Sequence, residues 1–466
     1  MSFGMKAINR IISLLAVLSV LAACGPELSP AENDKTSNTE TGDSGNGSSG
    51  NNEKDNGGTG GDSDNAGGSD GSGDTGDAGE TGGNSSGDNP DVNLDDNSKI
   101  AKEFAGGDGS EKNPYLIKTA AQLRKLSADC AKGIHYREMY FRLENDIRFN
   151  KNVLDENGEL NGNESKFEQW IPIGKDFTLK FGGNFNGNGH TVSGIVCTND
   201  SYEFAGLFGV CETVTHLAIK DSYFDGKKYV GSIAGWVEHV ANCVNYATIK
   251  NTASKTAVGG IAGNVDLLAD SCGNYGKVYG RHAAGIAGRV ASGRVHNSFN
   301  YGTIEGYVWA GGIVSTFTGG AHEISNNVNL GVVSCRASDN LRIGGITCHF
   351  GRGQVVLNVV NYGMILKNMA GIGALVGKYF KDGSSGYTEL RHGYYLDRTC
   401  YRAIGTDGSQ CPQTDVLSMK PEEMKSQDFL DKLNANVAEL KEVYPAYNFC
   451  NWKFGKDGFP VLDWMK

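Results

Sequence analysis

The sequence predicts an all-β protein whose main part is a parallel β-helix, and three observations carry that prediction. A phrase made of a small residue, an aliphatic residue and a small residue recurs between Ala205 and Gly377, with aliphatic positions 25–33 residues apart. A second phrase, Asn-Tyr-Gly or a close variant, follows each of the middle copies. The intervening runs are short and rich in β-branched and aromatic residues, which favours strands. One shared period of this length is typical of stacked repeats.

Stacked coils place equivalent side chains in columns about 4.8 Å apart. We expect the asparagine amides of one column to hydrogen-bond between coils, and asparagine to occupy left-handed corners, since four copies carry a second Asn three residues earlier. We expect the glycines to supply positive φ and close backbone approach. The aliphatic column should hold Ile233, Ile261, Ile286, Ile313 and Ile346, and the asparagine column Asn245, Asn274, Asn300 and Asn361.

The formal net charge of −11 is unevenly distributed along the 466 residues. Residues 25–98 hold 17 acidic residues and only two lysines, a net charge of −15. Residues 99–466 hold 39 basic and 37 acidic residues, a net charge of +2. Because the folded part has no basic stripe, a nucleic acid is not an expected partner.

Residues 1–23 have the features of a secretion signal. Lys6 and Arg10 precede an apolar run, residues 11–21, which is too short to span a bilayer. The run ends Leu-Ala-Ala-Cys at Cys24, which resembles the lipobox of bacterial lipoproteins. The resemblance implies cleavage before Cys24 and attachment of acyl chains to it; the alternative is an ordinary secretion signal with a chance cysteine.

The resemblance also implies a cell-envelope location. Gly25, rather than Asp, follows the cysteine, so the usual signal for retention in the inner membrane is absent and we expect a surface-exposed outer-membrane lipoprotein. Residues 24–98 are a Gly, Ser, Asp and Asn-rich stretch with almost nothing apolar to bury, and we expect a disordered tether. Several acyl chains would anchor the tether stably in the membrane.

The remaining chain is expected to form three parts. Residues 99–196 should hold an N-terminal cap and the first coils, with a capping-box helix over residues 119–132 that covers the open end of the β-helix. Residues 197–398 should hold the repeats. Residues 399–466 should form a small α/β C-terminal cap with two short helices, the second over residues 426–433 with Ser426 as its N-cap.

A resemblance to the GLUG-motif proteins of bacterial surfaces covers roughly residues 105–380. Its motifs are Gly107-Asp108-Gly109, Asn113-Pro114-Tyr115, Trp170-Ile-Pro-Ile-Gly174, Asn186-Gly-Asn-Gly-His-Thr191 and the Gly-aliphatic-Ala-Gly repeats. The motif also occurs in the repeat region, not the catalytic region, of immunoglobulin A-cleaving zinc metallopeptidases. The family implies a surface β-helix without a common activity. Two copies depart from the pattern, with Val314-Ser315 and Thr347-Cys348 in place of Ala-Gly.

Candidate catalytic clusters are sparse. The zinc-binding pattern His-Glu-x-x-His is absent, because His322-Glu323 lacks the second histidine. A glycan-active β-helix enzyme needs clustered carboxylates, and the closest pair in the repeats is Asp266 and Asp270. We interpret that pair as a solvated loop. The sequence therefore predicts no catalytic residue, no metal site and no cofactor.

Cysteines and tyrosines occupy equivalent repeat positions. Cys243 and Cys272 should lie on neighbouring coils within disulfide range, and Cys400 and Cys411 could close a surface loop; buried free thiols are the alternative for both pairs. The tyrosines could form a sugar-binding platform, but we favour a structural stack. The tyrosines are Tyr246, Tyr275, Tyr301 and Tyr362.

These expectations together favour a lipid-anchored cell-surface β-helix that acts as a non-catalytic adhesin or binding protein for a glycan or a host protein. Two alternatives remain open: a passive structural spacer of the envelope, and a glycan-active lyase-like or hydrolase-like enzyme. The activity rests on resemblance, because one fold supports many functions.

Overall fold

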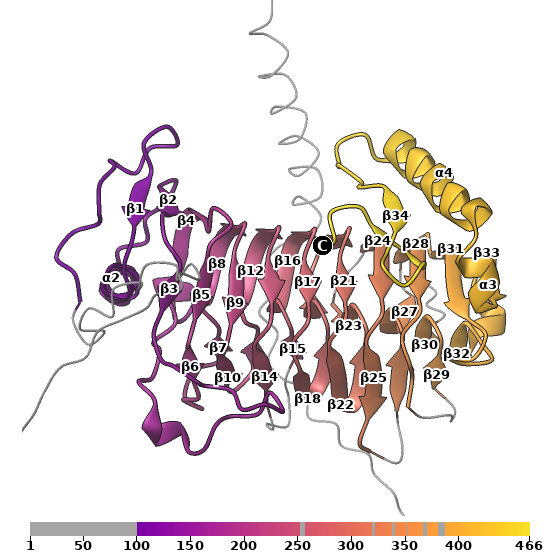
Figure 1. The fold of residues 1–466 in the computed structure, drawn as a ribbon, viewed down its shortest axis with the longest axis horizontal. Coiled ribbons are helices and arrows are strands. Elements are labelled where there is room, and N and C mark those ends of the chain that lie inside the picture. The colour runs from indigo at the N-terminus through magenta and orange to yellow at the C-terminus, as the bar shows by residue number, and fades with distance from the viewer. Residues whose placement is uncertain are drawn as a thin grey trace, which may run out of the picture. The chain divides into compact units, whose positions relative to one another are not determined.

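A computed structural model describes residues 100–251, 257–318, 322–337, 341–351, 353–366, 371–380 and 387–466. These residues confirm the predicted parallel β-helix, with about ten turns (Figure 1). The predicted signal peptide, Cys24 and the tether lie outside the described residues. By contacts the chain divides into Met1–Asn84 and Ser85–Lys466, and everything described belongs to the second unit.

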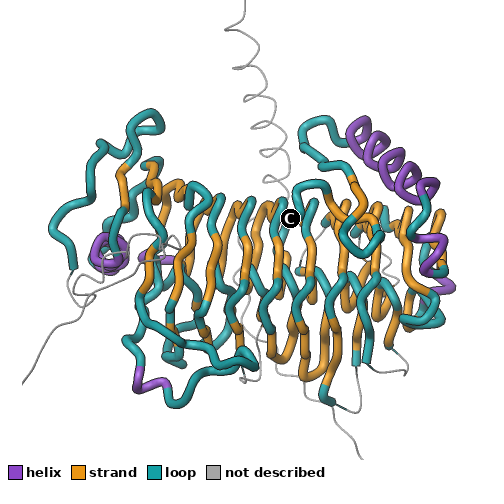
Figure 2. The backbone as a smooth tube through the Cα atoms, in the orientation of Figure 1, coloured by secondary structure: helices purple, strands orange, loops and turns teal. Residues whose placement is uncertain are grey.

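Each coil has three sides, and the strands of successive coils pair in parallel along each side (Figure 2). In the repeats, the first side begins at the third residue of the Gly-aliphatic-Ala-Gly phrase, for example Ala234 and Ala262. Its strands are β1 (Tyr115–Ile117), β2 (Tyr140–Leu143), β4 (Phe181–Asn186), β8 (Phe208–Thr215), β12 (Ala234–Ala241), β16 (Ala262–Asp270), β19 (Ala287–Val290), β20 (Arg294–His296), β23 (Val314–Phe317), β24 (Glu323–Asn329), β27 (Thr347–Gly351), β28 (Val355–Asn361), β30 (Val376–Phe380), β31 (Glu389–Leu396), β32 (Ile404–Thr406) and β33 (Gln413–Met419).

The second side follows a left-handed corner and carries the Asn-Tyr-Gly phrase. Its pairing continues from short strands into the longer β24, β28, β31 and β33 of later coils. The short strands are β3 (Ile147–Arg148), β5 (Thr191–Ser193), β9 (Ala218–Lys220), β13 (Val244–Asn245), β17 (Gly273–Asn274) and β21 (Phe299–Asn300).

The third side returns the chain to the next Gly-aliphatic-Ala-Gly phrase. It is a separate sheet, and its strands pair in parallel with their equivalents in neighbouring coils. The strands are β6 (Val196–Cys197), β7 (Phe204–Ala205), β10 (Tyr223–Asp225), β11 (Tyr229–Val230), β14 (Thr248–Lys250), β15 (Ala257–Gly259), β18 (Val278–Ala284), β22 (Thr303–Gly311), β25 (Val332–Cys335), β26 (Arg342–Gly344) and β29 (Ile372–Gly373).

The glycines of the two repeated phrases serve one of the two purposes that the sequence suggested. None of them has a positive φ, whereas Gly107, Gly109, Gly174 and Gly189 of the N-terminal motifs do. A Cβ atom on Gly276 would lie 1.9 Å from the carbonyl oxygen of Ala247 in the preceding coil, and one on Gly263 would lie 2.4 Å from the nitrogen of Val230. Glycine is therefore required at these positions for close backbone approach between coils and between sides, and not for a left-handed turn.

The predicted N-terminal helix is present as α2 (Ala120–Ala131), and Thr119 is its N-cap. The side chain of Thr119 accepts from the nitrogen of Gln122, while Gln122 Oε1 accepts from the nitrogen of Lys118, one residue earlier than a capping box requires. The helix buries four side chains in the solenoid core, next to the first coil: Ala120, Leu123, Leu126 and Cys130.

The C-terminal segment, residues 420–466, extends along one flank of the later coils (Figure 1). It contains α3 (Pro421–Met424), α4 (Gln427–Val443) and an antiparallel hairpin of β34 (Trp452–Phe454) and β35 (Pro460–Leu462). Ser426 caps α4 as predicted, but the helix continues ten residues beyond Leu433 because its apolar positions continue. These positions are Phe429, Leu430, Leu433, Val437 and Leu440, all buried against the coils.

Candidate binding surface

The five isoleucines of the aliphatic column lie in one file. The backbone nitrogens of the first four donate to the carbonyl of the next isoleucine along the file, over 2.9–3.2 Å, and that of Ile346 donates to Leu375 at 2.9 Å. None of the five side chains is exposed to solvent. The column is therefore a structural element of the core.

The asparagine column forms a continuous ladder inside the solenoid. Each Nδ2 donates to Oδ1 of the asparagine in the next coil, at 2.7–2.8 Å, from Asn245 through Asn274, Asn300 and Asn329 to Asn361. Each Oδ1 also accepts from the backbone nitrogen two residues later. Because these amides are buried and fully bonded, the ladder holds coils together and has no group left for a ligand.

A second column occupies the left-handed corners between the first and second sides. Its φ values lie between 49° and 57°. From Asn297 onwards the C-terminal segment covers this column through direct hydrogen bonds, such as Asn436 Nδ2 to Asn358 Oδ1 at 3.0 Å. The column comprises His216, Asn242, Ser271, Asn297, Asn326, Asn358, His392 and Asp415.

Neither of the two possible disulfides is present, because Cys243, Cys272, Cys400 and Cys411 are all free thiols. Cys243 and Cys272 do lie on neighbouring coils, but each thiol donates to a carbonyl of its own coil, two residues earlier, at 3.3 Å. Cys400 and Cys411 likewise contact separate carbonyl groups. Adjacent columns permit a disulfide geometrically without requiring one, because the backbone offers each buried thiol an acceptor.

Three of the four tyrosines form a stack on the second side. The rings of Tyr246 and Tyr275 lie 4.9 Å apart and 1° from parallel, and those of Tyr275 and Tyr301 lie 5.4 Å apart. Leu330 occupies the next position, so Tyr362 is separated from the stack; its hydroxyl donates to Pro460 in the C-terminal segment. The stacked ring faces cover one another, so a sugar ring has no open face between them, which agrees with a structural stack.

The sequence analysis missed a second aromatic group, at the corner between the third and first sides. We call it the aromatic corner, and it consists of Phe177, Phe204, Tyr229 and Trp236. Phe204 and Tyr229 stack at 5.6 Å and 11°, and Trp236 meets Tyr229 edge to face at 5.5 Å. Phe177, from the loop before β4, packs against Trp236 at 5.0 Å and is 51% exposed. The aromatic corner therefore reaches the surface.

One column of this corner contains a break. In register order it runs Phe204, Tyr229, Ala257, His282 and Trp309. Aromatic or imidazole rings thus lie on both sides of a methyl group. A sequence signal for this column exists, since four of the five residues lie four positions before the aliphatic residue of their repeat.

The side chain of Arg289 extends toward the earlier coils and lies over the rings beside that break. Its guanidinium carbon is 4.6 Å from the centroid of Tyr229 and 4.9 Å from that of Trp236, an arrangement that favours the cation. Burial lowers the pKa of Arg289. Among the described residues no carboxylate forms an ion pair with Arg289, although Asp266 is close enough to oppose that shift.

Asn264 lies between Trp236 and Arg289 in the register of the first side. Its Oδ1 accepts from Nε of Arg289 at 2.6 Å. Its Nδ2 is buried and has no hydrogen-bond partner within the described part of the chain. A buried donor without an acceptor is uncommon in folded proteins and calls for an explanation.

A second guanidinium stacks further along the same corner. His282 and Trp309 stack at 4.1 Å and 13°, and the guanidinium carbon of Arg342 lies 4.3 Å from the centroid of Trp309 and 4.7 Å from that of Phe380. Burial lowers the pKa of Arg342. Rings and guanidinium groups thus follow one another along this edge of the solenoid.

The carboxylate pair named from the sequence occupies β16. Asp270 accepts from Asn297 Nδ2 at 2.6 Å, whereas Asp266 lies toward Arg289 and His239. Burial raises the pKa of both carboxyls. In the described ranges no group of three or more His, Cys, Asp or Glu is arranged to hold a metal ion, and no described helix is long and apolar enough to cross a bilayer.

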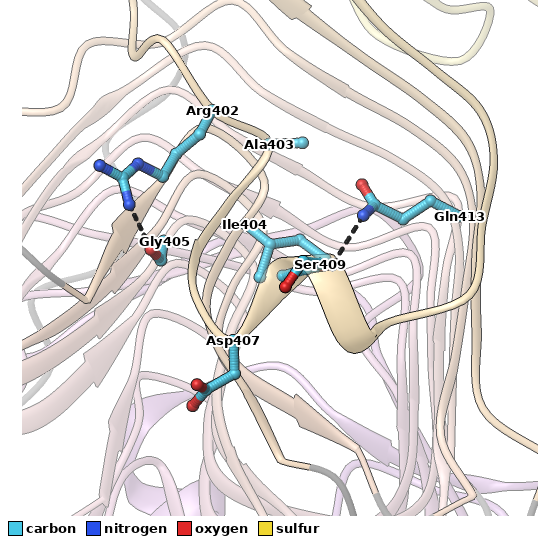
Figure 3. Close-up of a pocket in the computed structure, with 8 residues that line it drawn as sticks. Arg402, Ala403, Ile404, Gly405, Asp407, Ser409 and Gln413 are labelled. Carbon is cyan, nitrogen blue, oxygen red and sulfur yellow. Dashed lines mark hydrogen bonds between the residues drawn. The ribbon is translucent and has the colours of Figure 1, made fainter.

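A depression of about 400 Å³ lies beside β32 (Figure 3). Its polar groups are already engaged: Arg402 Nη1 donates to the carbonyl of Gly405, Gln413 Nε2 donates to that of Gly408, and Asp407 pairs with Lys378 at 3.8 Å. Glycine, alanine and backbone atoms make up much of its remaining wall. This depression offers a ligand little chemistry, and the aromatic corner is the stronger candidate.

Comparisons with known proteins give short sequence matches. No family model matches the chain. The chain is 37% identical over 107 residues to a "Putative Gly-rich membrane protein" of Evansella cellulosilytica, which is 23% of this chain and 10% of that protein. It is 25% identical over 164 residues to Halomucin of Haloquadratum walsbyi, 34% of this chain and 2% of that protein. The chain therefore matches only a small part of the length of these relatives.

One solved structure resembles the chain over most of its length. It is the crystal structure of a "putative immunoglobulin A1 protease" from Bacteroides ovatus. The match covers 78% of this chain and 96% of that chain, at 16% sequence identity and a TM-score of 0.44.

Proposed function

We propose that this chain is a cell-surface β-helix, held to the outer membrane by acyl chains on Cys24, that binds a glycan or a host protein without catalysing a reaction. The observation that carries the binding role is the aromatic corner with Arg289. Tryptophan, tyrosine and arginine are the side chains that most often dominate recognition surfaces. Here they form one cluster with two half-buried members, Trp236 and Arg289, at the surface.

The envelope location has separate support. The lipobox-like phrase at Cys24 and the resemblance to GLUG-motif surface proteins both favour it, and the 37% identical relative is named a membrane protein. The acidic composition of residues 24–98 suits a solvated tether, which would keep a binding body away from anionic lipid.

The location is tested on whole cells. Protease added outside intact cells should remove the chain, and a Cys24→Ala variant should no longer partition into detergent with the membrane fraction. A Cys24→Ala protein that still partitions with detergent would contradict the lipid anchor, and a chain protected until the cells are opened would contradict surface exposure.

Binding is tested with the soluble Cys24→Ala chain. A glycan array and a panel of host matrix proteins should each be screened, with Trp236→Ala as the matched variant. We expect a ligand whose binding falls at least about tenfold in Trp236→Ala, in the range of a binding hot spot. If neither screen gives a ligand, a passive spacer becomes the better account, since the buried isoleucine and asparagine columns serve a rigid spacer equally well.

A further inference from the structure

We propose that the aromatic corner, together with Arg289 and Asn264, is a binding site for the carboxylate-bearing sugars of an acidic glycan, such as uronic or sialic acids. The inference rests on the proposed binding function and names its site and its ligand class. Three features of the site carry it: the break at Ala257, the orphan amide of Asn264 and the stacked guanidinium of Arg289.

The break removes one ring from the column, at a residue that is itself only 5% exposed. Ala257 stands where the neighbouring coils carry Tyr229 and His282, so two rings flank a position without one. The guanidinium of Arg289 lies over the ring of Tyr229, which belongs to the coil before that of Ala257. The site is thus flanked by rings and bordered by two described cations, because Lys228 Nζ also lies 5.6 Å from the centroid of Tyr229.

The side-chain amide of Asn264 supplies a hydrogen-bond donor that has no acceptor. Asn264 is fully buried, its Oδ1 is held by Arg289, and its Nδ2 has no acceptor among the described residues. Leaving a buried donor unpaired disfavours the folded state, so an incoming acceptor oxygen gains by removing that penalty. Because Arg289 Nε already contacts the same amide, one negatively charged group could accept from both side chains.

The positive charge of Arg289 favours a ligand group that carries a negative charge. Arg289 makes no ion pair with a described carboxylate, and its guanidinium carbon lies within 4.9 Å of the ring centroids of both Tyr229 and Trp236. A planar guanidinium presents its N–H groups at its edge, in the geometry that a carboxylate accepts. A neutral sugar would leave this partly desolvated charge unmatched, so the site discriminates in favour of an anion.

The aromatic rings select a sugar acid over an acidic peptide. A uronic or sialic acid carries its carboxylate directly on a ring that also has an apolar C–H face. Trp236 lies 4.9 Å from the guanidinium carbon, and the exposed Phe177 packs against it. One sugar unit can therefore contact the rings and the cation together, whereas the carboxylate of Asp or Glu stands on a flexible chain without such a face.

The test is calorimetric titration of the full chain carrying Cys24→Ala. The probes are galacturonate oligosaccharides, sialyllactose, neutral galactose oligosaccharides of equal length, and an Asp/Glu peptide. We expect at least one sugar acid to bind at least tenfold more tightly than the neutral oligosaccharide and the peptide. The binding should weaken as salt rises, because it depends on a charge pair.

Two variants address the site. Arg289→Gln removes the cation. Asn264→Asp replaces the amide that has the unpaired donor by a carboxylate, which can form an ion pair with Arg289 within the protein. Both should lower affinity for the sugar acid at least tenfold. Asn264→Asp should keep or raise the melting temperature, because it removes an unpaired donor and adds an ion pair, so its loss of binding cannot be attributed to unfolding.

Two further variants serve as controls. Arg142→Gln removes an equal charge from β2, and Tyr275→Ala interrupts the tyrosine stack on the second side; neither should change affinity for the sugar acid. Equal binding of neutral and acidic sugars, of the peptide and the sugar acid, or of Asn264→Asp and the parent chain would overturn the inference. If the sugar acids fail but a host protein binds in the earlier screen, this inference falls and the proposed function stands.

Discussion

Trp452 donates from its indole Nε1 to Oδ1 of Asn326 at 2.7 Å, across 126 residues of sequence. Asn326 also donates from Nδ2 to Asn297 and to the carbonyl of Cys450. The side-chain amide of Asn326 therefore links the left-handed corner column to the C-terminal segment. Because the corners repeat from coil to coil, the segment forms the same kind of hydrogen bond with several coils.

Trp452→Phe should loosen the C-terminal segment without unfolding the coils. The variant loses one hydrogen bond, and Asn326 Oδ1 keeps a donor in Asn358 Nδ2, so the cost should be about 0.5–1.5 kcal/mol. Hydrogen exchange in α4 should accelerate by up to about tenfold. Trp170→Phe, whose indole donates to Leu207 in the early coils, should leave α4 unchanged; equal acceleration in both variants would contradict the local role.

Asn300→Ala should destabilise the solenoid. It removes one hydrogen bond from Asn274 Nδ2, which keeps the carbonyl of Gly276, and one from Asn329 Oδ1, which keeps the nitrogen of Gly331. Each lost hydrogen bond costs about 0.5–1.5 kcal/mol. The measurement is the free energy of unfolding in urea. The surface variant Asn157→Ala should change it by less than about 0.5 kcal/mol. A value for Asn300→Ala as small as that of the control would show that water replaces the missing amide.

The cysteine thiols of the core should stay reduced and unreactive. Burial raises the pKa of Cys243 to about 12 and holds the pKa of Cys272 well above its ordinary value, so little thiolate exists at pH 8. Iodoacetamide should label neither cysteine in the folded protein and both in denaturant, as read by peptide mass spectrometry. Partly exposed Cys400 is the internal comparison and should label first. A tryptic peptide that links Cys243 to Cys272 without reductant would contradict the prediction.

The contact between β33 and α4 should weaken in acid. Burial would raise the pKa of Asp415, but hydrogen bonds from Lys432, Tyr394 and His392 outweigh it and hold the pKa at about 2. Since the ordinary value is 3.8, the folded state is favoured above about pH 4, and that contribution disappears as the pH falls toward 2.

Unfolding free energies at pH 7, 4 and 2.5 check this expectation. The parent chain should lose stability between pH 4 and 2.5, and Asp415→Asn should lose less over the same interval because it has no proton to gain there. Asp428→Asn, in the first turn of α4, is the matched control and should follow the parent chain. Identical pH profiles for the parent and Asp415→Asn would place the acid-sensitive contact elsewhere.

Much of the solenoid was predictable because the spacing of repeated residues in the sequence determines which residues pair on neighbouring coils. Ile261 follows Ile233 by 28 residues and lies beside it in the file. The same logic placed Cys243 next to Cys272 but could not decide their chemistry, since proximity does not form a disulfide. Of the two roles expected for the repeat glycines, positive φ was wrong and close backbone approach was right. Gly276, for example, avoids a clash with Ala247, and that contact exists only after the coils stack.

The candidate site was largely invisible in the sequence. Tyr229 and Trp236 are seven residues apart, and whether they meet depends on how sharply the chain folds at Ile233 between them. Arg289 joins them from more than fifty residues away, because its long side chain reaches across neighbouring coils. The unpaired Nδ2 of Asn264, between Trp236 and Arg289 in the register of the first side, likewise has no signal in the sequence.

By itself the sequence determined the period, the parallel stacking, the two asparagine columns and the helix cap at Ser426, because each depends on local propensity or on a repeat that aligns itself. The tertiary structure alone decided where the C-terminal segment lies, which thiols remain free, and which outward side chains of different coils meet at the aromatic corner. Those outcomes depend on corner angles and side-chain reach, which are properties of the packed coils and have no local sequence code.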